Sequence, residues 1–168
     1  MKIDFIVISG ILVIFSFLPF ILFPLLRSKD EKNLRNKFKN ETSSRGLNIS
    51  YMLAWNSNLA GIDILRREFV LTQWLNEKFV VKHVDLNKIH TLKIMVENRL
   101  VERHNKNTEE LSRISLAFFQ SNSVEPVMVN LFDYDLNFTQ DYEYKNAQKL
   151  LAELQKYACA QPVLKHTA

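Results

Sequence analysis

One stretch near the N-terminus constrains this chain more than any other feature. From Phe5 to Leu26 the sequence FIVISGILVIFSFLPFILFPLL contains no ionisable side chain. A helix of about 22 residues rises roughly 33 Å, which matches the hydrocarbon core of a bilayer, about 30 Å. A cleaved secretory signal has a shorter apolar run of about 7 to 15 residues that ends in small residues. The stretch therefore predicts an uncleaved transmembrane anchor over residues 1–27.

A basic segment follows the apolar stretch and predicts its orientation. Between Arg27 and Thr42, six basic residues stand against three acidic ones. Such an excess marks the cytoplasmic end of a span. We therefore expect a single-pass protein of the inner (cytoplasmic) membrane, with the N-terminus outside and the C-terminal domain in the cytoplasm. Cys159, the one cysteine, cannot form an intrachain disulfide, which agrees with a reducing compartment.

The same basic residues have two interpretations, a topology signal alone or a contact with anionic lipid headgroups. Each lysine or arginine beside a membrane gains up to about 1 kcal/mol from anionic lipids. The residues that would make this contact are Arg27, Lys29, Lys32, Arg35, Lys37 and Lys39.

The positive charge is local, although the whole chain carries a net charge of +4. Without Lys2, Asp4 and the basic segment, 15 basic and 14 acidic residues remain. A nucleic-acid-binding domain would carry its excess charge on the folded part of the chain. We therefore expect the lipid bilayer, and no nucleic acid, among the partners.

The rest of the chain divides by composition. Residues 28–49 are charged and then rich in Asn, Ser and Thr, with too few apolar residues to bury a core, and are expected to be a basic and polar juxtamembrane linker. Residues 50–160 have the length of one domain, and residues 161–168 are expected to be a flexible tail. Within the domain, apolar residues at helical spacing predict an amphipathic helix from about Glu143 to Ala158; they are Ala147, Leu150, Leu151, Leu154, Tyr157 and Ala158.

Short segments before that helix predict β-strands. RISLAFF, VMVNLF, KFVVKHV and IHTLKIMV are rich in β-branched and aromatic residues, and Asn-rich turns separate them. The segment NSNLAGIDILRREFVLTQWL fits a helix and strands equally well, and Gly61 favours strands because it interrupts the helical pattern. The expected fold class is α+β: a transmembrane helix, then an antiparallel β-barrel or sheet of pleckstrin-homology (PH)-like order, capped by the C-terminal helix.

Three motifs carry a resemblance to a known group of proteins. These motifs are GIDILRREFVLT before a strand, VDLNKIHTLKI before another, and NAQKLLAELQ in the last helix. With the apolar stretch and basic segment, this layout resembles single-span membrane proteins of Bacteroidota-type bacteria that have a PH-like cytoplasmic domain. The resemblance covers most of residues 50–158. It implies a fold and no catalytic residues.

The residues of the domain show no catalytic signature. No glycine follows Gly61, which excludes a glycine-rich phosphate loop there. The histidines lack metal-site spacing, and Cys159 has no histidine nearby in sequence. An acidic group is interpreted as a solvated loop and helix N-terminus rather than a cation site; its members are Asp133, Asp135, Asp141 and Glu143. We expect no cofactor and no metal.

These observations predict a membrane-anchored, non-enzymatic interaction module. It would hold an unidentified protein partner or contact lipid headgroups at the inner membrane face. The alternative is a small membrane-tethered hydrolase or transferase. A concave pocket that gathers two or more polar side chains of perturbed pKa would distinguish the enzyme from the interaction module. Aromatic residues between Phe118 and Tyr144 are interpreted as core rather than as a ligand groove.

Overall fold

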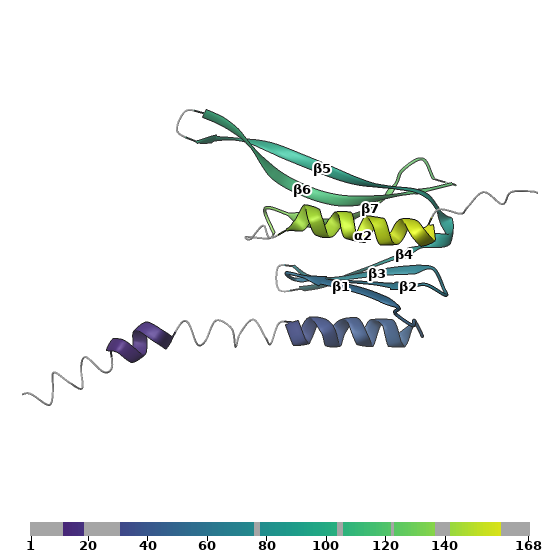
Figure 1. Cartoon of the computed structure of the whole chain (residues 1–168), viewed down its shortest axis with the longest axis horizontal. Coiled ribbons are helices and arrows are strands. Elements are labelled where there is room, and N and C mark those ends of the chain that lie inside the picture. The colour runs from purple at the N-terminus through teal and green to yellow at the C-terminus, as the bar shows by residue number, and fades with distance from the viewer. Residues whose placement is uncertain are drawn as a thin grey trace, which may run out of the picture.

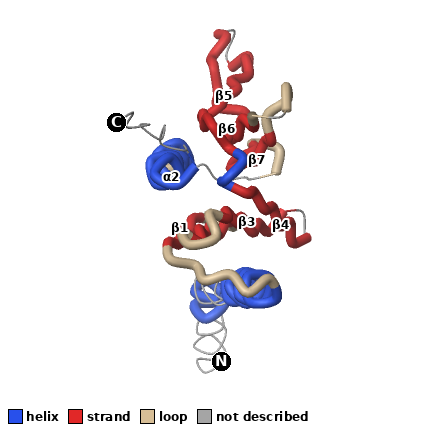
Figure 2. The backbone as a smooth tube through the Cα atoms, turned by 90° about the vertical axis from the view of Figure 1, so that its right-hand side faces the viewer, coloured by secondary structure: helices blue, strands red, loops and turns tan. Residues whose placement is uncertain are grey.

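Seven antiparallel strands form two separate sheets in the computed structural model of this chain. The structure describes residues 12–18, 31–75, 78–103, 106–121, 123–136 and 142–158. In Figure 1 the helix over residues 31–44 lies on one side of the first sheet, and the C-terminal helix α2 and the second sheet lie on its other side; Figure 2 shows α2 beside the second sheet.

The first sheet is a four-stranded meander. Its strands follow one another in the order β1-β2-β3-β4. Asn56 and Ser57 form the turn between the first two strands, and Asn56 adopts a left-handed backbone with φ of 44°, which asparagine tolerates better than most residues. The strand bounds are β1 (Tyr51–Trp55), β2 (Asn58–Asp63), β3 (Glu68–Leu75) and β4 (Lys78–Asp85).

A 3-10 turn, η1 (Leu86–Lys88), connects the first sheet to the second. The second sheet contains β5 (Ile89–Arg103), β6 (Lys106–Gln120) and β7 (Val127–Asp133) in that order. The last strand pairs only with Arg113–Phe118 of β6. The distal half of the β5–β6 hairpin therefore extends beyond the layers, as Figure 2 shows.

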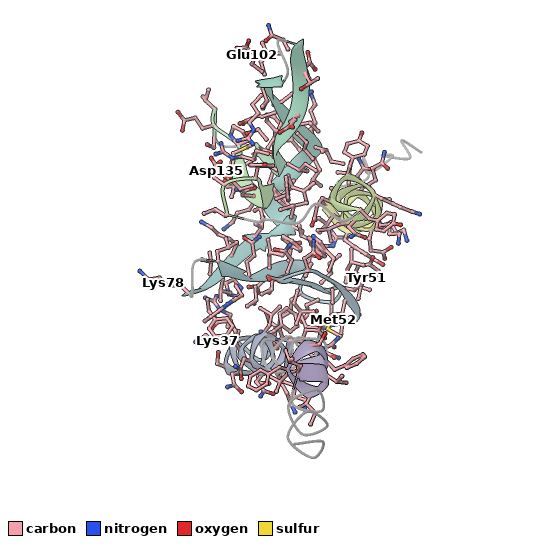
Figure 3. All side chains as sticks on the ribbon, turned by 90° about the vertical axis from the view of Figure 1, so that its left-hand side faces the viewer. Lys37, Tyr51, Met52, Lys78, Glu102 and Asp135 are labelled. Carbon is pink, nitrogen blue, oxygen red and sulfur yellow. The ribbon has the colours of Figure 1, made fainter. Side chains whose placement is uncertain are left out.

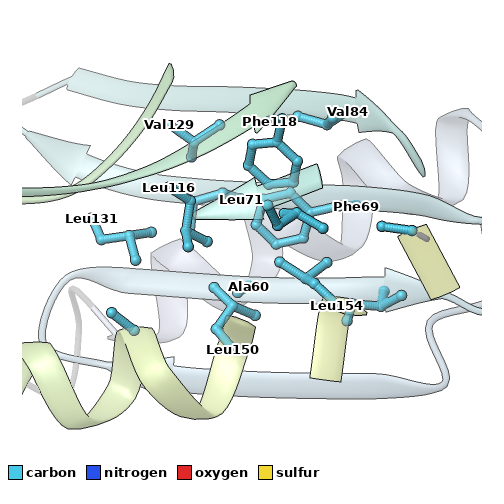
Figure 4. Close-up of a cluster of buried hydrophobic side chains, with 14 of the residues drawn as sticks. Ala60, Phe69, Leu71, Val84, Leu116, Phe118, Val129, Leu131, Leu150 and Leu154 are labelled. Carbon is cyan, nitrogen blue, oxygen red and sulfur yellow. The ribbon is translucent and has the colours of Figure 1, made fainter. Parts of the chain in front are cut away.

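Helix α2 (Glu143–Ala158) lies between the two sheets (Figure 1). Its buried apolar residues recur at intervals of three or four and line one side of the helix: Ala147, Leu150, Leu154 and Ala158. They join side chains of both sheets in one core, in which the rings of Phe69 and Phe118 stack with centroids 5.6 Å apart. Figure 4 shows this core. The helix thus packs against both sheets, which also contact each other directly through the rings of Phe69 and Phe118.

The helix over residues 31–44 covers the other face of the first sheet (Figure 1). Leu34 and Phe38 pack there on Leu59 and Val70. Residues 28–49 had been expected to be a polar linker, yet most of this segment is a docked helix. The correction has a simple cause: a helix needs only a narrow apolar stripe to dock, and residues four apart supply it.

The coarse fold prediction is confirmed, and its finer part is corrected. The structure is α+β, with antiparallel strands and a C-terminal helix whose bounds agree with the expected ones. The expected barrel is wrong for the described residues, because the strands form two sheets that do not close on each other. The hairpin of β5 and β6 is also longer than the apolar segments IHTLKIMV and RISLAFF indicated, because polar residues continue both strands.

The predicted transmembrane anchor lies mostly outside the described residues. Residues 12–18 are helical, and their large apolar side chains are exposed: Leu12, Val13, Ile14, Phe15, Phe17 and Leu18. Among the described residues, no helix combines the length and the apolar character that crossing a bilayer requires. The expected tail, residues 161–168, is also outside the described part of the chain.

Shortening single side chains of α2 should show that the helix is part of the core. We expect Leu154→Ala to lower the free energy of unfolding by about 2–5 kcal/mol, because Leu154 is fully buried and its removal leaves a cavity. Leu151→Ala removes the same atoms from a half-buried position and should cost clearly less. Urea denaturation of the full chain in detergent measures both. Equal losses of unfolding free energy in the two variants would show that α2 does not dock through the side that carries Leu150 and Leu154.

Candidate functional site

The helix over residues 31–44 positions four of the six basic residues singled out in the sequence. Leu34, Phe38 and Thr42 lie four residues apart, and each is only 5% exposed. This spacing turns one side of the helix to the sheet, so Lys32, Arg35, Lys37 and Lys39 remain exposed. Arg27 and Lys29 lie outside the described residues.

The docked helix separates these cations into two groups. Arg35 and Lys39 lie on the side of the helix that faces Met52, where the three side chains line one groove. Lys37 lies on the other side, as Figure 3 shows. The basic segment therefore does not present one uniform charged face.

Gly61 in β2 makes the close approach of this helix possible. A Cβ atom at Gly61 would lie 2.5 Å from Cζ of Phe38 and 3.0 Å from Cγ2 of Ile49. Real side chains do not approach so closely, so any larger residue would have to displace Phe38. The position of Arg35, one turn before Phe38, thus depends on the missing side chain of Gly61.

The chain leaves the helix through a fixed turn. Gly46 has a φ of 64°, a left-handed conformation common at helix ends, and the backbone N–H of Leu47 donates to Thr42 O at 2.9 Å. The buried carboxylate of Asp63 then accepts hydrogen bonds from the backbone N–H groups of Asn48 and Arg66, at 2.8 and 2.9 Å. Burial raises the pKa of Asp63, but these hydrogen bonds outweigh it and leave the pKa below its ordinary value.

An ionic cluster connects the end of the helix to the sheet. The ring nitrogens of His83 lie 3.2 Å from carboxylate oxygens of Glu41 on the helix and Glu68 on β3. Both carboxylates therefore lie within hydrogen-bonding distance of the same imidazole ring. Arg45 also binds Glu41 at 3.2 Å, and this hydrogen bond is the main reason that the pKa of Glu41 lies below its ordinary value.

A pocket of about 510 Å³ opens where both helices meet the β1–β2 turn. Its volume is typical of a small-molecule site. The lining comes from the first turns of the helix over 31–44, from the β1–β2 turn and from the first turns of α2: Glu31, Leu34, Arg35, Ala54, Trp55, Asn56, Asn58, Leu59, Tyr142, Lys145, Asn146 and Lys149. We call it the turn pocket.

Positive charge dominates the turn pocket. Arg35 comes from one helix, and Lys145 and Lys149 come from another, one turn apart. None of the three forms an ion pair within the described part of the chain; Lys145 lies 5.9 Å from the ring centroid of Tyr142. Among the described lining residues, Glu31 is the only acidic one.

Neutral polar groups complete the wall of the turn pocket. Trp55 is 7% exposed, and its Nε1–H has no acceptor among the described residues. Asn56 donates from its side-chain amide to buried Glu143, the first residue of α2. Tyr142 precedes that residue with a φ of 55°, a strained conformation for an aromatic residue.

A second, more apolar groove of about 310 Å³ shares Arg35 and Leu59 with the turn pocket. It runs between the helix over 31–44 and the segment that enters β1. Its other lining residues are Phe38, Lys39, Thr42, Leu47, Ile49 and Met52. A cationic pocket and an apolar groove therefore adjoin at Arg35.

The other residues considered from the sequence do not meet in one site. Asp133 pairs with Arg113 at 3.0 Å and Asp135 with Arg99 at 3.5 Å, whereas Glu143 is buried beside Asn56. The interpretation of this acidic group as solvated is therefore wrong for Asp133 and Glu143, which are both buried. The described residues contain no group of three potential metal ligands. Cys159, Asp141, His104 and His166 lie outside the described residues.

Sequence reasoning missed the α2 half of the turn pocket. Lys145 and Lys149 are four residues apart on an amphipathic helix, which places them together and away from its apolar side. That spacing was a signal, but nothing in the sequence brought them to Arg35. Known proteins offer no further guide, because no family model, no curated protein and no solved structure matches this chain.

The contact between Phe38 and Gly61 can be tested by a double-mutant cycle. We expect Gly61→Ala to lower the free energy of unfolding by about 1–3 kcal/mol through overpacking. The same change in a Phe38→Leu background should cost less, because the ring atoms that the new methyl group meets are gone. Thermal denaturation of the four full-length variants measures the coupling. Additive losses would contradict the close approach.

The pKa of Glu41 predicts how the docked helix responds to acid. Because the pKa is lower in the folded state, the ionised carboxylate stabilises the fold above the ordinary pKa, and this stabilisation is lost as the pH falls through the lowered pKa. In Glu41→Gln the free energy of unfolding should therefore fall less steeply as the pH decreases from about 6 to about 3. Glu102→Gln, at the distal hairpin (Figure 3), serves as the control and should leave the profile unchanged. If the unaltered protein, Glu41→Gln and Glu102→Gln all showed the same dependence of stability on pH, a stabilising role of Glu41 would be refuted.

Proposed function

We propose that the protein is a membrane-anchored, non-enzymatic interaction module of PH-like type at the inner face of the cytoplasmic membrane. The apolar stretch from Phe5 to Leu26 anchors it, and the cations after that stretch contact anionic lipid headgroups. The observation that carries this proposal is the docked basic helix. Its first described residue, Glu31, follows Leu26 by five residues, and the helix packs on the domain through Leu34 and Phe38 and leaves its cations exposed.

The distance along the chain supports a position near headgroups. Five residues span at most roughly 17 Å, so Glu31 and the first turn of the helix lie close to wherever Leu26 leaves the bilayer. Lys32 and Arg35 are then within reach of the surface, where each gains up to about 1 kcal/mol from anionic lipids. The exposed apolar side chains of residues 12–18 also need an apolar environment.

The arrangement of the domain supports the PH-like part of the proposal. A four-stranded and a three-stranded antiparallel sheet, followed by a C-terminal helix, is the order of elements that the resemblance to Bacteroidota-type membrane proteins implies. A tethered hydrolase or transferase is the less supported alternative. Such an enzyme needs a nucleophile beside a base, and the base candidate His83 contacts Glu41 and Glu68 instead of a serine or cysteine.

A reporter fused after Ala168 of the full chain tests the orientation. We expect alkaline phosphatase to be inactive there and green fluorescent protein to be fluorescent, because basic residues keep the domain in the cytoplasm. Lys32→Glu, Lys37→Glu and Lys39→Glu together should raise phosphatase activity.

The matched control reverses three exposed lysines far from the apolar stretch: Lys78→Glu, Lys82→Glu and Lys88→Glu. These changes alter the net charge equally but should leave the reporters unaffected. An active phosphatase on the unaltered protein would refute the proposed localisation.

A further inference from the structure

We propose that the turn pocket binds a phosphate group carried by a small ligand, either the headgroup of an anionic lipid or a soluble phosphate ester. The lipid alternative rests on the proposed function, because it requires the domain to lie at the membrane. The pocket itself would bind either source by the same chemistry.

Three uncompensated cations carry the inference. Arg35, Lys145 and Lys149 reach the same pocket from two helices that are far apart in sequence, and none has a carboxylate partner among the described residues. Like charges brought together in this way repel one another unless an anion joins them. Three positive charges and one negative charge, that of Glu31, are among the described lining residues, and this excess matches a doubly charged phosphate better than a single carboxylate.

The neutral parts of the pocket favour the same kind of ligand. The lining residues Lys145 and Asn146 belong to the first turn of α2, where the helix dipole favours anions; Glu143 in the same turn already supplies one negative charge. Independently, the buried Nε1–H of Trp55, a residue of the pocket lining, lacks an acceptor among the residues that the structure describes. The guanidinium of Arg35 can bind phosphate through two N–H groups.

The surroundings suggest why a lipid is one of the two sources. The apolar groove that shares Arg35 and Leu59 with the turn pocket could receive the apolar part of a ligand whose phosphate lies in the pocket. Glu31, at the rim, is also the pocket residue closest in sequence to the apolar stretch. A nucleic acid or an acidic peptide fits less well, because the cations line one concave pocket rather than an extended surface.

The two tryptophans provide a direct test. Trp55 lines the pocket, whereas Trp74 packs on Phe79 with ring centroids 4.4 Å apart and is not part of the lining. The indole N–H signals of the nitrogen-15-labelled full chain in zwitterionic detergent can be assigned with Trp74→Phe. The probes are glycerol 3-phosphate, short-chain phosphatidic acid, short-chain phosphatidylcholine and a peptide of glutamates.

We expect saturable movement of the Trp55 signal with glycerol 3-phosphate, phosphatidic acid or both, and a constant Trp74 signal. Glycerol 3-phosphate alone would identify a soluble ester, and phosphatidic acid alone would identify a lipid headgroup. Arg35→Gln and Lys149→Gln should each weaken binding about tenfold, because each removes a charged hydrogen-bond donor. The matched control Lys37→Gln, on the other side of the same helix, should change it less than about twofold.

Three results would overturn the inference. These are a Trp55 signal that neither phosphate probe moves, a response to the peptide or to phosphatidylcholine only, and equal losses in Lys37→Gln and Lys149→Gln. The reporter fusions test orientation without any ligand. The membrane proposal can therefore fail while the pocket still binds glycerol 3-phosphate, and the reverse result is equally recognisable.

Discussion

Burial of the first sheet on both faces is the constraint on which the rest of the structure depends. Antiparallel sheets commonly leave one face in water, yet all six residues of β2 are buried. Ala60 and Ile62 face the core that contains α2, whereas Leu59 and Gly61 face the helix over residues 31–44. Because each face receives one helix and both helices begin near the β1–β2 turn, their first turns and their cations meet there.

A buried polar network ties the two sheets together beside this meeting point. Asn58 accepts a hydrogen bond from Gln73 at 2.6 Å and donates to Leu131 O of the second sheet at 3.3 Å. Buried amides are costly unless satisfied, so this pairing specifies how β2 and β7 sit relative to each other. Asn58 also lines the turn pocket. The shape of the pocket and the packing of the two sheets are therefore coupled through one side chain.

Local patterns explain which predictions were confirmed. The apolar period of Leu150 and Leu154 identified α2, because helical periodicity survives in any amphipathic helix. Strand composition identified β4, and Gly61 correctly favoured strands over a helix for the segment that forms β2 and β3. The docked helix was missed because Leu34 and Phe38 are two apolar residues among many polar ones. Their burial depends on Gly61, which lies in β2 and is therefore not visible in the pattern of the helical segment itself.

The amino-acid sequence by itself determined the elements that depend on neighbours along the chain: the apolar stretch, the local excess of positive charge, the strands and the last helix. Only the tertiary structure decided that the strands form two sheets, that the basic segment docks, and that Arg35 meets Lys145 and Lys149. The physical reason is the separation along the chain of the residues that interact. Periodicity and charge act over a few residues, whereas the turn pocket depends on which faces pack together across more than a hundred residues of chain.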